Sequence, residues 1–171
     1  MKQNKTIAPA RLARRLVREC AKRGVTLGCA ESCTGGLIAK MITDIPGSSA
    51  VLSGAFVTYT NEIKIGVLGV DPETIARHTE VSSACAAEMA VCARERLGTT
   101  LAVSATGFAG PGGGSDVDPV GTVYLGLATP SGVTVERFCA PAGADRRQVR
   151  SAAAVRAMER LLRAVLDETD A

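Results

Sequence analysis

The stretch Ala30-Glu31-Ser32-Cys33-Thr34-Gly35-Gly36 joins a short apolar run to an amphipathic one. The run before it, residues 25–30, is apolar and compatible with a β-strand. The run after it has apolar residues at helical spacing, namely Leu37, Ile38, Met41 and Ile42. We therefore predict a strand-to-helix corner with Ser32 in the turn.

Two interpretations of this corner are open. Backbone N–H groups at a helix start lack intrahelical partners and carry the positive end of the helix dipole, so residues 34–36 would hold an anion or a developing oxyanion. Alternatively, Thr34 caps the helix and the two glycines form a tight packing turn. The residues of the stretch alone favour neither interpretation.

Helical and extended patterns alternate on both sides of the corner. Leu12, Leu16 and Cys20 share one face of a helix predicted for residues 9–23, with arginines on the other face. Downstream we expect helices at 34–43, at 61–68 with Asn61 as the cap, at 74–78, from 82 onward with Ser82 as the cap, and at 145–167. We expect strands at 51–59, 100–105, 121–129 and 133–138, and a hairpin turn at residues 130–132 joins the last two. We predict a single three-layer α/β/α domain with a mixed sheet, which binds its ligand where strand ends meet loops.

The composition narrows the function classes. A length of 171 residues suits one domain with a substantial core, and 46% of the residues are apolar. The net charge of +3 comes mostly from the terminal helices and does not indicate a nucleic-acid partner. The sequence has neither a signal-peptide core nor an apolar stretch of roughly 20 residues, so we expect no membrane partner and a cytoplasmic location.

The cysteines and the histidine form no metal or redox motif. His78 is the single histidine, which excludes a histidine-rich metal site, and we expect it at the surface. No two cysteines have the two-residue spacing of a zinc or redox motif, so we expect reduced cysteines packed in the core. The six are Cys20, Cys29, Cys33, Cys85, Cys92 and Cys139.

A glycine-dense segment at residues 106–115 follows a predicted strand. Glycine lets a backbone approach a ligand closely, because it accepts positive φ and has no side chain to collide. The segment matches neither the Walker A pattern nor the dinucleotide fingerprint. It is therefore either a ligand-binding loop of another kind or a flexible surface turn.

A serine nucleophile needs a base, and His78 has an unremarkable sequence context. A neutral lysine can replace histidine, because burial or a neighbouring positive charge lowers the pKa of a lysine. Lys64 lies between Ile63 and Ile65 in an apolar setting, whereas Lys40 lies on a helix farther from any loop. The alternative for Lys64 is an ordinary solvated helix lysine.

Four motifs, taken in order, resemble the CinA C-terminal domain family. They are Ala-Glu-Ser-Cys-Thr-Gly-Gly at 30–36, Phe-Val-Thr-Tyr-Thr-Asn-Glu-Ile-Lys at 56–64, Gly-Phe-Ala-Gly-Pro-Gly-Gly-Gly-Ser at 107–115 and Pro-Val-Gly-Thr-Val-Tyr at 119–124. The resemblance covers about residues 9–166 and implies one amidohydrolase domain over 1–171. It implies hydrolysis of nicotinamide mononucleotide to nicotinate mononucleotide and ammonia, in pyridine nucleotide recycling. Longer family members add an N-terminal pyrophosphatase-type domain, so the resemblance implies a stand-alone deamidase.

The resemblance also implies residue roles. Ser32 is similar to the family nucleophile, Lys64 to its general base, and Tyr59 to a hydroxyl that positions or relays the proton. Backbone N–H groups near residues 33–36 would stabilise the oxyanion, and Arg146 would bind the phosphate. No metal or cofactor is implied, and the family analogy suggests a homodimer or higher homo-oligomer. The implied substrate-binding residues are Glu31, Cys33, Thr34, Gly35, Gly36, Ser48, Ser49, Asn61, Thr106, Gly107, Ala109, Gly110, Gly113 and Arg146.

Two positions depart from the family pattern. Asp118 stands where the family usually has a lysine before Pro-Val-Gly, and Phe108 stands where an aliphatic residue is more common. If that lysine holds the loop or the phosphate, its loss would weaken substrate binding or change substrate preference. The phosphate-binding arginine also stays open between Arg146, Arg147 and Arg150.

Three other functions are compatible with these residues. The first is an amidase for another small amide, and charge reversal at Arg146 distinguishes it from a nucleotide amidase. The second is a non-catalytic nucleotide-binding or interaction module, in line with the family's link to competence and DNA damage. The third is a thiol mechanism through Cys33, in which Cys33→Ser abolishes activity and Ser32→Ala does not.

Overall fold

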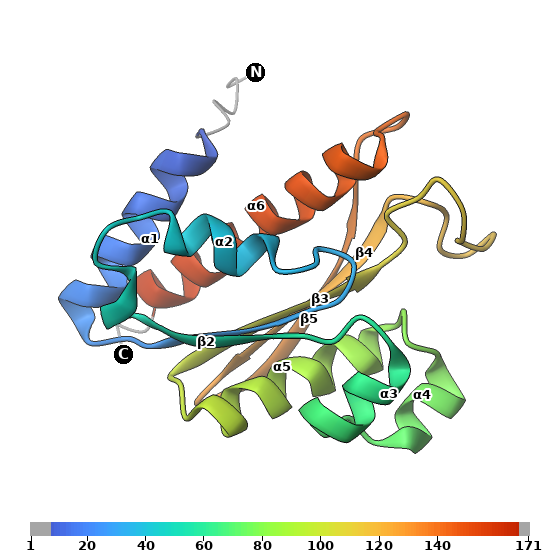
Figure 1. Ribbon diagram of the computed structural model, residues 1–171, viewed down its shortest axis with the longest axis horizontal. Helices are drawn as coiled ribbons and strands as arrows, with labels where there is room; N and C mark the ends of the chain where they lie inside the picture. The colour runs from blue at the N-terminus through green and yellow to red at the C-terminus, as the bar shows by residue number, and fades with distance from the viewer. Residues whose placement is uncertain (1–7, 168–171) are drawn as a thin grey trace.

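The computed structural model describes residues 8–167 and contains a five-stranded mixed sheet with the order β2-β1-β3-β4-β5 (Figure 1). The strands are β1 (Leu27–Glu31), β2 (Leu52–Val57), β3 (Leu101–Gly107), β4 (Thr122–Thr129) and β5 (Gly132–Cys139). β1 pairs in parallel with both β2 and β3, whereas β4 pairs antiparallel with β3 and β5. The mixed sheet that we predicted is confirmed.

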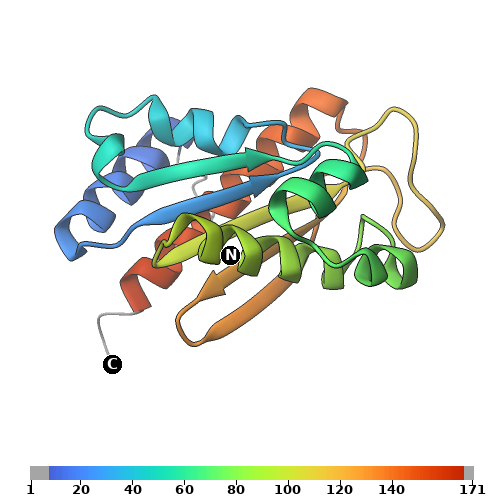
Figure 2. The same ribbon diagram turned by 60° about the horizontal axis from the view of Figure 1, so that its bottom comes forward.

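Helices cover both faces of the sheet, so the molecule has three layers (Figures 1 and 2). One face carries α1 (Pro9–Arg23), α2 (Leu37–Thr43) and α6 (Arg146–Asp167). The other face carries α5 (Ser83–Leu97), with α3 (Asn61–Ile63), the π-helical turn η2 (Lys64–Leu68) and α4 (Pro72–His78) beside it. A short 3-10 turn, η1 (Ser48–Ala50), precedes β2.

The core has a larger and a smaller part. The larger lies between the sheet and the α1, α2 and α6 layer, and α6 contributes an alanine-rich buried face that includes Ala153, Ala154 and Ala157. The smaller packs α5 against the sheet through Cys85 and Met89. Small side chains in both helices allow close approach to the strands, which suits a sequence with few aromatic residues.

Helix starts differ from the predictions where another residue supplies the cap. The helix predicted from residue 34 begins at Leu37, and Thr60 rather than Asn61 caps α3. Asp71 caps α4 through its side chain, so this helix begins at Pro72 rather than at 74. The predicted cap at Ser82 is confirmed, since its Oγ accepts a hydrogen bond from the Cys85 N–H. Each of these helices begins next to the residue or turn that provides hydrogen-bond acceptors for its first free N–H groups.

Strand limits follow the pairing of the backbone. β1 begins at Leu27 rather than 25, and β2 covers 52–57 rather than 51–59, because the parallel register joins only these residues. β3 continues to Gly107, so the first two residues of the glycine-dense segment pair with β4 instead of belonging to a loop. The predicted hairpin at residues 130–132 is confirmed by the antiparallel pairing of β4 with β5.

The cysteines fit the core prediction only in part. Four are buried, but Cys92 is half-buried and Cys139 is exposed on the edge strand β5. His78 is exposed at the end of α4, as expected. Between residues 8 and 167, no helix is long and apolar enough to cross a membrane, and no three His, Cys, Asp or Glu side chains are grouped so as to hold a metal ion.

Candidate active site

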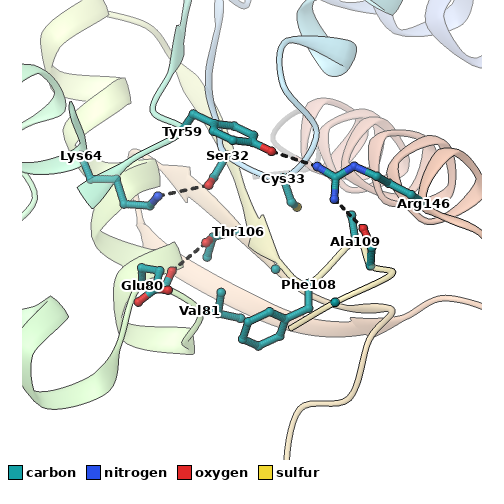
Figure 3. Close-up of a pocket in the computed structure, with 13 residues that line it drawn as sticks. Ser32, Cys33, Tyr59, Lys64, Glu80, Val81, Thr106, Phe108, Ala109 and Arg146 are labelled. Carbon is teal, nitrogen blue, oxygen red and sulfur yellow. Dashed lines mark hydrogen bonds between the residues drawn. The ribbon is translucent and has the colours of Figure 1, made fainter. Parts of the chain in front are cut away.

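A pocket lies at the carboxyl end of β1 and β3, beside the turn that follows β1 (Figure 3). Three parallel strands end at this edge of the sheet, so residues that follow each of them come together there. The lining residues are Ser32, Cys33, Tyr59, Lys64, Glu80, Val81, Thr106, Gly107, Phe108, Ala109, Gly110, Gly112 and Arg146.

Ser32 and Lys64 are hydrogen-bonded in this pocket. The Lys64 Nζ lies 3.1 Å from the Ser32 Oγ and also donates to the Thr58 carbonyl at 2.9 Å. The Ser32 N–H donates to the Ala105 carbonyl at 2.8 Å, which fixes the turn against β3. Lys64 comes from the junction of α3 and η2, so two segments that lie far apart in the sequence meet at the serine.

Lys64 is buried without a counter-charge. Its side chain is 1% exposed, and in the described part of the chain no carboxylate forms an ion pair with it. Burial lowers the pKa of Lys64, and the nearby Cys85, Glu80 and Cys33 oppose that shift without cancelling it. Burial disfavours the ammonium form and so favours the neutral amine, which is the form that can accept a proton.

The neighbouring thiol is a poor alternative nucleophile. Cys33 is buried, and this burial raises the pKa of its thiol to about 12. The reactive form of cysteine is the thiolate, so the protonated Cys33 thiol is unreactive at neutral pH. This argues against the thiol mechanism through Cys33.

Glu31 caps α2 and does not line the pocket. Its fully buried carboxylate accepts hydrogen bonds from the N–H groups of Ile38 at 3.1 Å and Ala39 at 2.9 Å. The anion at this helix start is thus the protein's own side chain. The side-chain cap is therefore Glu31 and not Thr34, which corrects that part of the second interpretation. Its tight glycine turn is present, because Gly35 and Gly36 have positive φ and the Gly35 N–H donates to the Ser32 carbonyl.

Several other predicted binding residues lie outside the pocket. Thr34 is fully buried, and its carbonyl accepts a hydrogen bond from Arg150 at 2.7 Å. Gly35 faces Arg150, and Gly36 precedes α2 with a left-handed φ. Asn61 begins α3 without lining the pocket, and Gly112 lines the pocket whereas Gly113 does not.

Ser48 and Ser49 lie at the opposite edge of the sheet. They belong to η1, which precedes β2, whereas the pocket lies where β2 and its parallel neighbours end. Their prediction as binding residues is therefore not supported, because the length of β2 separates them from Ser32.

Arg146 is the arginine that lines the pocket. One guanidinium nitrogen donates to the Tyr59 hydroxyl at 2.9 Å, and another donates to the Gly110 carbonyl at 2.6 Å. Figure 3 shows the Tyr59 hydroxyl directed toward Arg146. Arg147 is exposed and does not line the pocket, and Arg150 donates a hydrogen bond to the Thr34 carbonyl. Tyr59 is therefore placed to position the arginine.

Four lining residues are absent from the predicted site residues. Phe108 and Gly112 lie in the glycine-dense segment, whereas Glu80 and Val81 come from another part of the chain. They belong to the connection between α4 and α5, where the Thr106 hydroxyl donates to the Glu80 carbonyl at 2.6 Å. Nothing in the sequence pattern links them to Ser32. The predicted cap at Ser82 was the available signal, since it placed the preceding residues in a loop.

The comparisons with known proteins agree with this fold. The family model described as CinA C-terminal domain matches residues 9–165, so the chain belongs to the CinA C-terminal domain family. A "CinA-like protein" from Cyanothece sp. is 55% identical over 111 residues, which are 65% of this chain and 27% of that protein. Another from Gemmatimonas aurantiaca is 43% identical over 157 residues, which are 92% of this chain and 36% of that protein. The chain thus spans about a quarter to a third of the curated relatives it matches.

Solved structures of similar proteins have the same architecture. The competence/damage inducible protein CihA from Agrobacterium tumefaciens has a TM-score of 0.88 and 40% identity, over 95% of this chain and 99% of that one. A CinA superfamily protein from Klebsiella pneumoniae has a TM-score of 0.88 and 32% identity, over 94% and 99% of the two chains. Their names state membership of the superfamily and a link to competence or damage.

Proposed function

We propose that this chain is an amidase that hydrolyses the carboxamide of nicotinamide mononucleotide to nicotinate mononucleotide and ammonia. The observation that carries the proposal is the 3.1 Å contact between the buried Lys64 Nζ and the Ser32 Oγ inside a pocket. A hydroxyl next to a lysine whose neutral form is favoured by burial is an arrangement that suits acyl transfer.

The first half of the reaction forms an acyl-enzyme. The neutral Lys64 amine takes the Ser32 proton as the Ser32 Oγ attacks the carboxamide carbon. The tetrahedral intermediate collapses, the C–N bond breaks, and the Lys64 ammonium returns that proton to the leaving nitrogen, which departs as ammonia. The substrate is then an ester of Ser32.

The second half releases the acid. Lys64 takes a proton from a water molecule, whose oxygen attacks the ester carbon. The bond to the Ser32 Oγ breaks, and the proton on Lys64 returns to that oxygen. The sum of the two halves consumes one amide and one water and yields one carboxylic acid and one ammonia.

The Cys33 N–H is the oxyanion donor that this mechanism uses. The N–H groups of Ile38 and Ala39 are occupied by the Glu31 carboxylate, and the Gly35 N–H donates to the Ser32 carbonyl at 3.1 Å. Cys33 directly follows the nucleophile and lines the pocket. By analogy with other acyl-transfer enzymes, such a donor lowers the barrier by about 3 kcal/mol.

Arg146 is the phosphate-binding residue of the proposal. It lines the pocket, and its guanidinium can exchange its present hydrogen bonds to Tyr59 and Gly110 for stronger, charge-assisted ones to phosphate oxygens. Gly107, Ala109 and Gly110 also line the pocket, and their small size leaves room for the ribose and the ring.

The test is to incubate the purified chain with nicotinamide mononucleotide, measure ammonia and identify the nucleotide product by chromatography. Arg146→Gln is expected to raise KM about 10- to 100-fold, in line with the loss of a charged hydrogen-bond donor. The exposed Arg147→Gln is the matched control and should leave KM unchanged. Binding of the nucleotide without ammonia release would contradict the proposal and favour a binding module.

A further inference from the structure

Glu80 brings a carboxylate to the wall of the pocket. Within residues 8–167, the Glu80 side chain makes no hydrogen bond and no ion pair, although Glu80 lines the pocket. Its backbone is held in place, because its carbonyl accepts the Thr106 hydroxyl at 2.6 Å. An unpaired carboxylate at the wall of a ligand pocket is suited to receive a cation from the ligand.

The charge of Glu80 reaches the reacting groups. Burial lowers the pKa of Lys64, and the Glu80 charge partly opposes this shift. The carboxylate therefore lies within electrostatic range of the Lys64 Nζ, which is hydrogen-bonded to Ser32. Val81 and Phe108 line the pocket beside it and offer apolar surface to a flat ring (Figure 3). A ring whose amide meets Ser32 would therefore lie near a negative charge.

The two ends of the pocket carry opposite charges. Arg146 lies across the pocket from Glu80 in Figure 3 and is tied to Tyr59 and Gly110 rather than to an acidic side chain. A ligand that places an anionic group at Arg146 and a cationic ring near Glu80 would complement both ends.

We propose that Glu80 is a specificity-determining residue that selects amides borne on a cationic, pyridinium-type ring over amides on neutral rings. The inference rests on the proposed function, and it specifies the substrate class of that same site. The ring nitrogen of nicotinamide mononucleotide carries such a positive charge, whereas a benzamide ring of the same shape does not. A Coulomb interaction in a partly desolvated pocket discriminates the two without any change in shape.

The experiment compares Glu80→Gln with the wild type on two substrates. One is nicotinamide mononucleotide, and the other is the ribose 5′-phosphate that carries a neutral benzamide ring. Glu80→Gln keeps the size of the side chain and removes its charge, and Glu80→Asp is the charge-preserving control. We expect Glu80→Gln to lower kcat/KM about tenfold for the cationic substrate and to change it less than about twofold for the neutral one. We expect Glu80→Asp to keep the preference for the cationic substrate.

Two outcomes would overturn the inference. Equal losses of kcat/KM on both substrates would mean that Glu80 acts through Lys64 or through the fold. A pH profile that is shifted with both substrates would show that it acts through Lys64. No change on either substrate would mean that the carboxylate does not meet the ring.

A binding measurement separates this inference from the proposed function. The affinity of both nucleotides for Ser32→Ala, with and without Glu80→Gln, is measured by calorimetry and needs no turnover. If Ser32→Ala binds the cationic nucleotide more tightly and the added Glu80→Gln removes this preference, the inference is supported, even if the wild type releases no ammonia. Equal affinities for the two nucleotides overturn it even where the amidase activity is present.

Discussion

At the scale of single residues, the central feature is the hydrogen bond between Lys64 and Ser32. A buried ammonium without an ion-pair partner is costly, and among the described residues the Lys64 Nζ is hydrogen-bonded to the Ser32 hydroxyl and the Thr58 carbonyl alone. Burial therefore lowers the pKa of Lys64, which favours the neutral amine beside the Ser32 hydroxyl.

The pH dependence of kcat/KM follows from this lowered pKa. Protonated Lys64 cannot accept the Ser32 proton, so we expect kcat/KM to rise with pH and to level off above a pKa that lies below the ordinary lysine value of 10.5. Rates of ammonia release over a pH series measure this. Lys64→Arg, whose guanidinium stays protonated, should be nearly inactive at every pH, and a profile that falls as pH rises would contradict the account.

At the scale of elements, α2 is positioned by the strand before it. Glu31 is the last residue of β1, and its carboxylate reaches the N–H groups of Ile38 and Ala39 in the first turn of α2. The interaction fixes the turn that presents Ser32, because it links both sides of that turn through one buried side chain.

Glu31→Gln should destabilise the fold by about 2 kcal/mol. The substitution removes the charge from two hydrogen bonds. It also places the amide N–H₂ opposite one of the backbone N–H groups of Ile38 and Ala39, so that two donors face each other. Urea unfolding measures the free energy of unfolding. The control is Glu73→Gln, which breaks only an exposed ion pair with Arg77 and should cost less than about 1 kcal/mol. Equal effects of the two substitutions would show that Glu31 is not the cap.

The glycine-dense loop is held at its far end by Asp118. The Asp118 carboxylate accepts hydrogen bonds from the Arg137 Nε at 2.8 Å and the Tyr124 hydroxyl at 3.1 Å. Arg137 also donates to the Val117 carbonyl at 2.6 Å, so the loop is tied to β4 and β5. The acidic residue that departs from the family pattern thus pairs with a basic residue on β5.

Asp118→Asn should loosen this loop and weaken substrate binding. The loop carries Ala109 and Gly110 into the pocket, and the Gly110 carbonyl accepts a hydrogen bond from Arg146. We expect KM for nicotinamide mononucleotide to rise about fivefold with little change in kcat, as steady-state kinetics would show. Asp116→Asn changes an exposed residue of the same loop and is the control. A fall in kcat with KM unchanged would contradict this positioning role.

At the scale of the whole molecule, the site exists because three parallel strands end at one edge. Ser32 follows β1, Lys64 comes after β2, and Thr106 lies near the end of β3. Helix α5 packs against one face of the sheet and holds these strands in place. The buried Ser104 hydroxyl donates to the Ala86 carbonyl at 2.5 Å and accepts from the Gly126 N–H at 3.2 Å, which joins α5 to two strands.

Gly126→Ala should destabilise the whole fold by about 1–3 kcal/mol. A Cβ at Gly126 would collide with the Ala86 carbonyl oxygen and would come within 2.5 Å of the Ser104 Oγ, so α5 would have to shift. Thermal unfolding measures the loss. Gly66→Ala is the control, because a Cβ at Gly66 meets nothing within 4 Å and helps a helical turn. A neutral effect at Gly126 would mean that α5 is packed loosely.

The pattern of apolar residues predicted the layers and the order of the elements, because periodicity reports which face of each segment is buried. Helix α1 matched its predicted limits, since its apolar face and the glycine that follows it are both local signals. The pairing of Ser32 with Lys64 rested on the resemblance to a family, because no local pattern joins residues that are 32 positions apart.

The predictions that missed depend on long-range contacts. A glutamate is rarely buried, and the Glu31 cap reaches seven and eight residues ahead, beyond the local capping pattern. Ser48 was assigned to the site although its place before β2 puts it at the wrong edge of the sheet. Glu80 reaches the pocket through the packing of α4 and α5, which the sequence does not specify.

The most direct test of the central claim is ammonia release from nicotinamide mononucleotide by the wild type, Ser32→Ala, Lys64→Met and Lys40→Met. Lys64→Met keeps the length of the side chain without its amine, and Lys40, paired with Asp44 at the surface, is the control. We predict activity in the wild type and Lys40→Met, a loss of about 10²–10⁴-fold in Lys64→Met, and a loss at least as large in Ser32→Ala. Activity that survives in Ser32→Ala or Lys64→Met, or its absence from a folded wild type, would contradict a serine–lysine amidase.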